Sequence, residues 1–183
     1  MPDRVIDCCS LLNLFTGWGG LAELRSLQRT WHICEAAISE SEYTREFTVH
    51  GDVVNVPLNM AALTNSGLLH SVRPETQAEL NDYVEFAIEI DDGEAQSLAI
   101  AKHRGFTLLT DDRKALQIAQ RAEINVPTIS TVVVLREWAQ LDPQNEARLR
   151  AVVRRISVLA KFGPRAGSIE HDWWIRYLKG PEN

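Results

Sequence analysis

Short apolar runs alternate along the chain with longer segments that have the apolar spacing of helices. Val5–Ile6 and Phe106–Thr110 are continuous apolar runs of strand length, and each is followed by an aspartate. The clearest helical spacing is formed by Leu80, Tyr83, Val84, Ala87 and Ile88. Apolar strands that alternate with helices are typical of a parallel sheet covered on both faces. We therefore predict an α/β fold, a three-layer α/β/α arrangement with a central, mostly parallel sheet.

The same patterns predict the boundaries of the other elements. Strands are expected at 5–6, 32–34, 68–72, 106–110 and 126–130. Helices are expected after a cap at Ser10 and over 21–28, 35–46, 80–88, 93–104, 112–122 and 132–139. The segment 47–57 alternates around His50-Gly51-Asp52, which indicates an irregular hairpin or a decorated loop.

A second, smaller unit is predicted after Asp142-Pro143. The helix beyond this boundary has an apolar face made of Leu149, Val152, Val153, Ile156 and Leu159 or Ala160. Trp173, Trp174 and Tyr177 are too many large apolar groups for a free tail. We predict residues 1–140 as one domain and residues 141–183 as a C-terminal helical extension, packed on the core or on a second copy of the chain.

The composition is that of a globular protein with unevenly distributed charge. The 183 residues are 45% hydrophobic and 24% charged, which suffices for one sizeable core. The formal net charge is −6, but residues 146–165 carry six basic side chains against Glu146 alone. An acidic body suits metal cations and a basic segment suits phosphates, although acidic faces are most often only solvated.

The N-terminus and the cysteines bear on location and redox chemistry. Asp7 lies where a secretory signal would need its apolar core, so we expect a cytoplasmic protein without membrane association. Cys8, Cys9 and Cys34 lack the spacing of a zinc site or a redox pair, and we expect them to be reduced core residues. The five histidines form no motif.

Acidic residues recur where predicted strands end or helices begin. They are Asp7, Asp111 and Asp112 after strands, Glu94 in a first helical turn, and Glu40 in the helix after the second strand. Side chains just after the strands of an open parallel sheet face one crevice. Converging carboxylates repel one another unless a cation neutralises them, and oxygen ligands favour Mg²⁺ or Mn²⁺. Each acid alone is also typical of a helix cap or a solvated position, so only their joint occurrence indicates a metal site.

This joint pattern resembles the PIN-domain nucleases over about residues 1–140. The segments that carry the resemblance are Val5–Leu14, Glu35–Glu40, Asp92–Ala95 followed by Leu98-Ala99, and Leu108–Ala115. In that family, acids at the corresponding places bind a divalent metal. The resemblance implies metal binding by Asp7, Glu40, Glu94, Asp111 and Asp112, with Asp7, Glu40, Glu94 and Asp112 as catalytic residues. The family also keeps a small polar residue soon after the first aspartate, and Ser10 takes that place as a candidate for substrate binding.

The resemblance also implies an activity and partners. We expect hydrolysis of RNA phosphodiester bonds with Mg²⁺ or Mn²⁺, leaving a 5′-phosphate. Arg150, Arg154 and Arg155 on the basic helix are candidates for contacts with the RNA backbone, or form only a solvated face. Because the family includes toxin ribonucleases, further expectations are a role as the toxin of a toxin–antitoxin pair and an antitoxin protein as partner. The apolar C-terminal extension adds the expectation of a homodimer.

Other interpretations remain open at this point. A PIN-like module could bind RNA or protein without catalysis, with its acids only capping helices. Haloacid dehalogenases need an acid where Cys9 lies, and receiver domains need a lysine where Ser130-Thr131 lies. Glu42 competes with Glu40 for the second acidic position, but it lies about 200° around the predicted helix, and we prefer Glu40.

Overall fold

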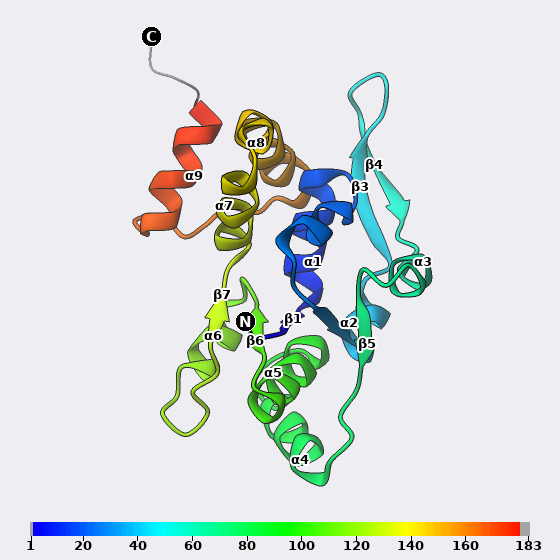
Figure 1. The fold of residues 1–183 in the computed structure, drawn as a ribbon, viewed down its shortest axis with the longest axis vertical. Helices are drawn as coiled ribbons and strands as arrows, with labels where there is room; N and C mark the ends of the chain where they lie inside the picture. The colour runs from blue at the N-terminus through cyan, green and yellow to red at the C-terminus, as the bar shows by residue number, and fades with distance from the viewer. Residues whose placement is uncertain (1, 180–183) are drawn as a thin grey trace.

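A computed structural model describes residues 2–179 as helices layered on a central sheet (Figure 1). The sheet has five strands in the order β5-β2-β1-β6-β7, and all neighbouring strands are parallel. The strands are β1 (Arg4–Ile6), β2 (Trp31–Cys34), β5 (His70–Val72), β6 (Thr107–Leu109) and β7 (Thr128–Ile129). The predicted α/β fold with a parallel central sheet is confirmed.

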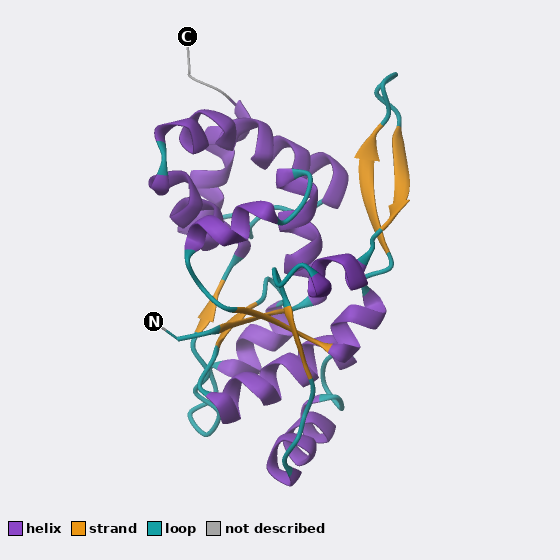
Figure 2. Cartoon of the chain, turned by 45° about the vertical axis from the view of Figure 1, so that its right-hand side comes forward, coloured by secondary structure: helices purple, strands orange, loops and turns teal. Residues whose placement is uncertain are grey.

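Helices cover both faces of this sheet (Figures 1 and 2). They are α1 (Cys8–Trp18), the 3-10 helix η1 (Ala22–Leu27), α2 (Glu35–Glu40), α3 (Met60–Asn65), α4 (Gln77–Phe86), α5 (Asp92–Arg104), α6 (Arg113–Ala119), α7 (Thr131–Leu141), α8 (Pro143–Arg155), the π-helical turn η2 (Ile156–Ala160) and α9 (Ile169–Lys179). Within residues 2–179, no helix has both the length and the apolar character needed to cross a membrane.

Two apolar cores lie on opposite faces of the sheet. Val5 and Leu108 pack in a cluster with residues of α4, α5 and α6. Their neighbours Ile6 and Leu109 pack in a larger cluster with residues of α1, α7 and α8. Successive side chains of a strand point to opposite faces, so a strand covered on both sides buries neighbouring apolar side chains in different cores. This double burial explains the continuous apolar runs in the sequence.

The C-terminal helices α8 and α9 pack on the same larger core. Gly17 of α1 permits the close approach of α8 and η2, since a Cβ at this position would lie 2.7 Å from Cδ1 of Ile156. On α9, Trp174 is only 2% exposed, and its indole N–H donates a hydrogen bond of 2.9 Å to Ser157. The chain after Asp142 therefore contributes directly to the main hydrophobic cluster.

A two-stranded antiparallel hairpin, β3 (Tyr43–Phe47) and β4 (Val53–Pro57), projects from the body (Figure 2). It replaces the second half of the helix predicted over 35–46, which is wrong beyond Glu40. Packing explains this difference, because Thr44 is 4% exposed and its hydroxyl lies 3.1 Å from that of Thr16 on α1. Such tertiary contacts outweigh helix propensity, which differs little between residues.

Two further expectations are corrected by the structure. The first helix is capped by Asp7 and begins at Cys8, so Ser10 lies inside its first turn. Helix α4 forms where expected, but Leu80, Val84 and Ile88 on its predicted apolar face are 41%, 64% and 81% exposed. The helix buries Phe86 instead, at 3% exposure, against the cluster shared with α5 and α6. Helical periodicity identified the helix but not the side that is covered.

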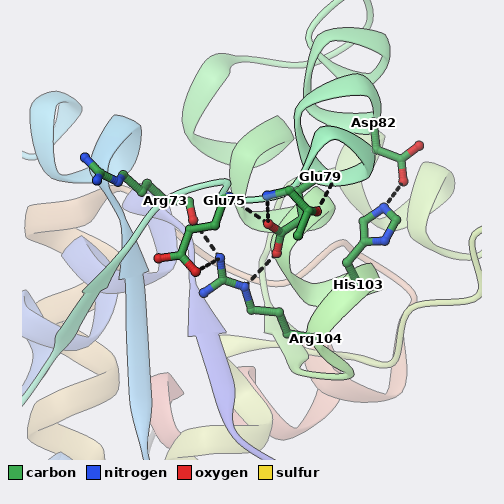
Figure 3. Close-up of polar contacts among 7 residues, drawn as sticks. Arg73, Glu75, Glu79, Asp82, His103 and Arg104 are labelled. Carbon is green, nitrogen blue, oxygen red and sulfur yellow. Dashed lines mark hydrogen bonds and ion pairs between the residues drawn. The ribbon is translucent and has the colours of Figure 1, made fainter.

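A polar network joins the start of α4 to the end of α5 (Figure 3). Glu79 accepts hydrogen bonds from the amides of Glu75 and Thr76 at 2.7 and 2.9 Å and from Nε of Arg104 at 2.7 Å. Arg104 also donates to the carbonyl oxygen of Arg73 at 2.6 Å. Burial alone would raise the pKa of Glu79, but these donors outweigh burial and lower the pKa to about 2.

Replacing Glu79 should weaken the fold in a pH-dependent way. The pKa of Glu79 is lowered from an ordinary 4.5 to about 2, so its stabilisation is complete above pH 4.5 and disappears as the pH falls towards 2. At pH 7, Glu79→Gln should reduce the free energy of unfolding, measured with urea, by on the order of 2–3 kcal/mol. Glu75→Gln is the control, because the Glu75 side chain is 69% exposed and its ion pair with Arg104 is 3.6 Å long. Equal effects of the two variants would contradict this assignment.

Candidate functional site

The carboxyl ends of the central strands bring together residues from distant parts of the sequence. Asp7 follows β1, Asp111 and Asp112 follow β6, and Thr131 opens the helix that follows β7. The start of α5, with Glu94 in its first turn, lies beside α2 at the same edge. Since the strands are parallel, these side chains converge on one edge of the sheet.

Asp7 is fully buried and only half satisfied by hydrogen bonds. Its Oδ1 caps α1 by accepting a hydrogen bond of 2.6 Å from the amide of Ser10, whereas its Oδ2 is buried without a partner in the described chain. Burial, with the negative charge of Asp111 acting in the same direction, raises the pKa of Asp7 to about 7. The neighbouring donors of Thr110 and Ser10 oppose this rise, although no hydrogen bond from residues 2–179 reaches Oδ2. Asp7 is thus a carboxylate that lacks a positive partner.

Asp111, in contrast, is saturated with hydrogen bonds. Its Oδ1 accepts from the amide of Thr131 at 3.0 Å, and its Oδ2 accepts from Ser10 at 3.2 Å and Asn13 at 3.1 Å. The Thr131 hydroxyl also donates to Oδ2. Burial still raises the pKa of Asp111, although these donors act against it. Asp111 therefore connects the first half of α1 to the start of α7 through hydrogen bonds.

Glu40 reaches the site through Gly93 at the start of α5. The amide of Gly93 donates a hydrogen bond of 2.9 Å to Oε1 of Glu40. A Cβ on residue 93 would lie 3.0 Å from the carboxyl carbon of Glu40 and closer still to Oε2, so only glycine leaves room for this carboxylate. Glu42 lies beyond the end of α2 and is exposed. Of these two glutamates, only Glu40 therefore makes this contact.

Glu94 and Asp112 complete the acidic group. Glu94 is 7% exposed, and its Oε2 is buried without a partner in the described residues. Burial raises the pKa of Glu94, and repulsion from Glu40, Asp91 and Asp112 adds to this increase. Asp112 caps α6 by accepting a hydrogen bond of 2.8 Å from the amide of Ala115. The predicted acids therefore influence one another electrostatically, as expected for neighbours in one crevice.

Two cavities flank the acids. One, of about 520 Å³, lies between α5 and α6 and is lined by Glu94, Asp112 and Lys114, among others. The other, of about 450 Å³, lies between α1, the hairpin and the chain after η2, and it is lined by Asp111 and Asp112. Asp112 lines both cavities, whereas Asp7 and Glu40 line neither. A ligand longer than either cavity could therefore pass over Asp112.

The suitability of the acids for a metal ion depends on which oxygens are free. Within residues 2–179, no group of three or more histidine, cysteine or acidic side chains is arranged closely enough to hold an ion. Asp7 and Glu94 each offer a buried oxygen without a partner. Mg²⁺ is commonly held by one or two carboxylates together with waters and substrate phosphates. The residues present are compatible with that mode, in which Asp7 and Glu94 would offer their unpartnered oxygens to the ion.

The other predicted residues fall into two groups. Ser10 lies in the site, between Asp7 and Asp111. Arg150 and Arg154 are exposed on α8, and neither lines the two cavities beside the acids. Arg155 donates a hydrogen bond of 3.0 Å to the carbonyl oxygen of Thr16, which joins α8 to α1. The structure thus brings Ser10 to the acids and leaves these arginines on another surface.

The cysteines do not provide a reactive thiol. Burial of the sulfur atoms, with nearby acids acting in the same direction, raises the pKa of Cys8 to about 11 and that of Cys9 to about 12, although Cys9 as a whole residue is exposed. Burial also raises the pKa of Cys34, whose sulfur accepts a hydrogen bond from the Ala37 amide and caps α2. Cys9 is exposed, which corrects its expected place in the core. All three thiols stay protonated near neutral pH, so none is suited to nucleophilic catalysis.

Sequence reasoning missed three residues that shape the site, namely Asn13, Gly93 and Thr131. Thr131 directly follows β7 and its cap, so the rule that was applied to the acids would have found it. Asn13 lies on α1 one turn beyond Ser10, on the face that Asp111 contacts. Gly93 gave no local signal, because its role depends on Glu40, more than fifty residues away in the sequence.

The chain combines a parallel α/β sheet with carboxylates that gather at the carboxyl edge of the strands. The family model described as a PIN domain matches residues 4–153. The chain therefore belongs to the PIN-domain family, and the resemblance inferred from the sequence is confirmed. A comparison with curated proteins gives no significant match. PIN domains are commonly nucleases that use divalent metals, so at a coarse level the chain is a nuclease-type hydrolase.

Proposed function

We propose that this chain is an endoribonuclease that depends on Mg²⁺ or Mn²⁺. The observation that carries the proposal is the pair of buried carboxylate oxygens without partners, on Asp7 and Glu94, at the carboxyl edge of a PIN domain. Leaving charged groups buried and unpaired is costly for folding. A divalent cation that both residues bind would remove that cost and supply a reason for their position.

The acidic residues would have different roles in such a site. Asp7 and Glu94 would hold the ion, Asp112 lies between the cavities, and Glu40 is anchored on Gly93. Asp111, held by four hydrogen bonds, keeps the helices that carry Ser10 and Thr131 in place. When bound, the ion would orient a phosphodiester and lower the pKa of a bound water. RNA as the substrate and a 5′-phosphate product rest on the family resemblance.

The competing function is a PIN-like module that binds RNA or protein without catalysis. Its acids would serve only as helix caps, which suits Asp112 and one oxygen of Asp7. Glu94 argues against it, because its buried Oε2 has no partner in the described chain. The expected toxin role, the antitoxin partner, the homodimer and the RNA contacts of Arg150 and Arg154 remain predictions from the sequence.

The proposal is tested by cleavage of an end-labelled RNA pool, with Glu40 and Glu42 as a matched pair. Wild-type protein should cleave with Mg²⁺ or Mn²⁺ and not with EDTA. Glu40→Gln should lower the rate by about 10²-fold, since it removes a charge at the site, and Glu42→Gln should stay within twofold. Absence of cleavage with either metal by folded wild-type protein would favour the binding module.

A further inference from the structure

The cavity between α1, the hairpin and the chain after η2 differs in chemistry from the acidic group beside it. Its walls include Tyr43 and Arg45 from β3 and Lys161 and Phe162 from the segment that leaves η2. Asp111 and Asp112 line the same cavity. Aromatic and cationic side chains therefore lie directly beside the carboxylates, in a space of about 450 Å³. Lys161 and Phe162 lie beyond the residues that match the family model.

The two aromatic side chains are presented in different ways. Tyr43 is 56% exposed, although it lies at the base of the hairpin beside the buried Thr44. Phe162 is half-buried and packs edge-on against Trp174, with ring centroids 5.5 Å apart and planes at 89°. Trp174 thus holds Phe162 in place, whereas more than half of Tyr43 is exposed to solvent. An exposed aromatic ring beside cations is a stacking platform for a nucleic-acid base.

The two cations, Arg45 and Lys161, both line the cavity. Arg45 donates a hydrogen bond of 3.3 Å to the carbonyl oxygen of Leu159, which leaves the rest of its guanidinium free. Lys161 has a left-handed backbone with φ of 56°, uncommon for a residue with a long side chain, where the chain turns out of η2. Within residues 2–179, neither cation forms an ion pair. Both are available to a phosphate.

We propose that this cavity is a subsite for one nucleotide of a single-stranded RNA, next to the phosphate that is cleaved. The base stacks on Tyr43, and the phosphate on its far side contacts Arg45 and Lys161. The proposal rests on the proposed ribonuclease function, because the RNA strand would then continue over Asp112 into the cavity between α5 and α6. In this proposal the RNA is recognised by the β3–β4 hairpin, through Tyr43 and Arg45, and by the segment after η2, through Lys161.

The size of the cavity favours a single strand. Sites for small ligands measure roughly 300–1,000 Å³, and this cavity lies in the lower part of that range. Such a space takes one base with its sugar, and a base must leave its pair to stack on a protein ring. A duplex would keep its bases inside and meet only the cations. The affinity for a single strand should therefore depend on Tyr43, while the affinity for a duplex should not.

Binding can be measured without cleavage, in EDTA, by fluorescence anisotropy of a labelled eight-residue uridine oligonucleotide. Tyr43→Ala should weaken binding about tenfold, the usual effect of losing one stacked base, and Tyr43→Phe should stay within twofold. Lys161→Gln should weaken binding and reduce the slope of log Kd against log salt by about 0.7. Arg176→Gln, which removes an exposed charge on α9, is the charge-matched control. A duplex probe should show no effect of Tyr43→Ala.

The outcomes separate this subsite from the nuclease itself. Wild-type affinity in both Tyr43→Ala and Lys161→Gln, or no binding of the single strand by wild-type protein, would overturn the subsite even if RNA is cleaved with metal. Weakened binding in these variants would support the subsite even if no metal restores cleavage. If Tyr43→Ala fails to fold, the single-strand affinity and salt dependence of Lys161→Gln, compared with those of Arg176→Gln, test the subsite.

Discussion

Replacing Asp7 by asparagine should stop catalysis and yet stabilise the metal-free protein. Asparagine can still cap α1 through its side-chain oxygen, so the local structure is kept. The cleavage rate should fall by about 10²–10³-fold, as when one preorganised charge is removed from an active site. In EDTA at pH 8, the free energy of unfolding should rise by about 1–3 kcal/mol, because a buried charge without a partner is removed. Urea denaturation and the RNA cleavage assay measure the two effects.

The effect of Asp7 on stability should change with pH in a defined direction. Its pKa is raised from 3.8 to about 7 in the folded protein, so the fold is most stable relative to the unfolded chain when Asp7 is protonated. Without metal, the difference between wild type and Asp7→Asn should be small below pH 4, grow as the pH rises, and level off above pH 7. Metal binding competes with this proton, so the metal affinity of the wild type should increase through the same range.

Metal should therefore stabilise the wild type and not the Asp7→Asn variant. Millimolar Mn²⁺ should raise the melting temperature of the wild type, since a ligand that binds only the folded state stabilises it, and should leave Asp7→Asn unchanged. Asp52→Asn, at the exposed turn of the hairpin, is the matched control and should behave as the wild type. An Asp7→Asn protein that cleaves RNA normally and keeps the Mn²⁺ response would refute the assignment of Asp7.

Replacing Trp174 by alanine should be the most destabilising change in the C-terminal helices. Trp174 is 2% exposed, contacts Phe162 and donates a hydrogen bond to Ser157. Truncation of a buried tryptophan to alanine removes about 3–5 kcal/mol, a large part of the stability of a typical domain. Urea denaturation should show this loss in a single transition, because α8 and α9 belong to the main core.

The neighbouring tryptophan provides the control for this prediction. Trp173 is only partly buried, and its ring packs mainly on Tyr177 of the same helix, with centroids 4.7 Å apart. Trp173→Ala should therefore cost clearly less than Trp174→Ala. Equal losses, or a loss below 1 kcal/mol for Trp174→Ala, would show that α9 is not anchored through this residue.

The sequence by itself determined the class of fold and the edge at which the acids lie. Continuous apolar strands such as Val5–Ile6 arise because both faces of the sheet are covered, and that local signal needs no knowledge of distant partners. The position of Asp7, Asp111 and Asp112 after strands then followed from parallel connectivity alone. These features were predictable because each depends on residues close together in the chain.

Only the tertiary structure decided how the acids are held and which surfaces are free. Asp111 is satisfied by Thr131 and Asn13, Glu40 is received by Gly93, and Thr44 is drawn into a strand by Thr16. Each of these contacts joins residues that are far apart in the sequence, and periodicity reports only which residues of one element share a face. The same limit explains why the apolar row on α4 was correctly predicted as helical and yet lies largely in solvent.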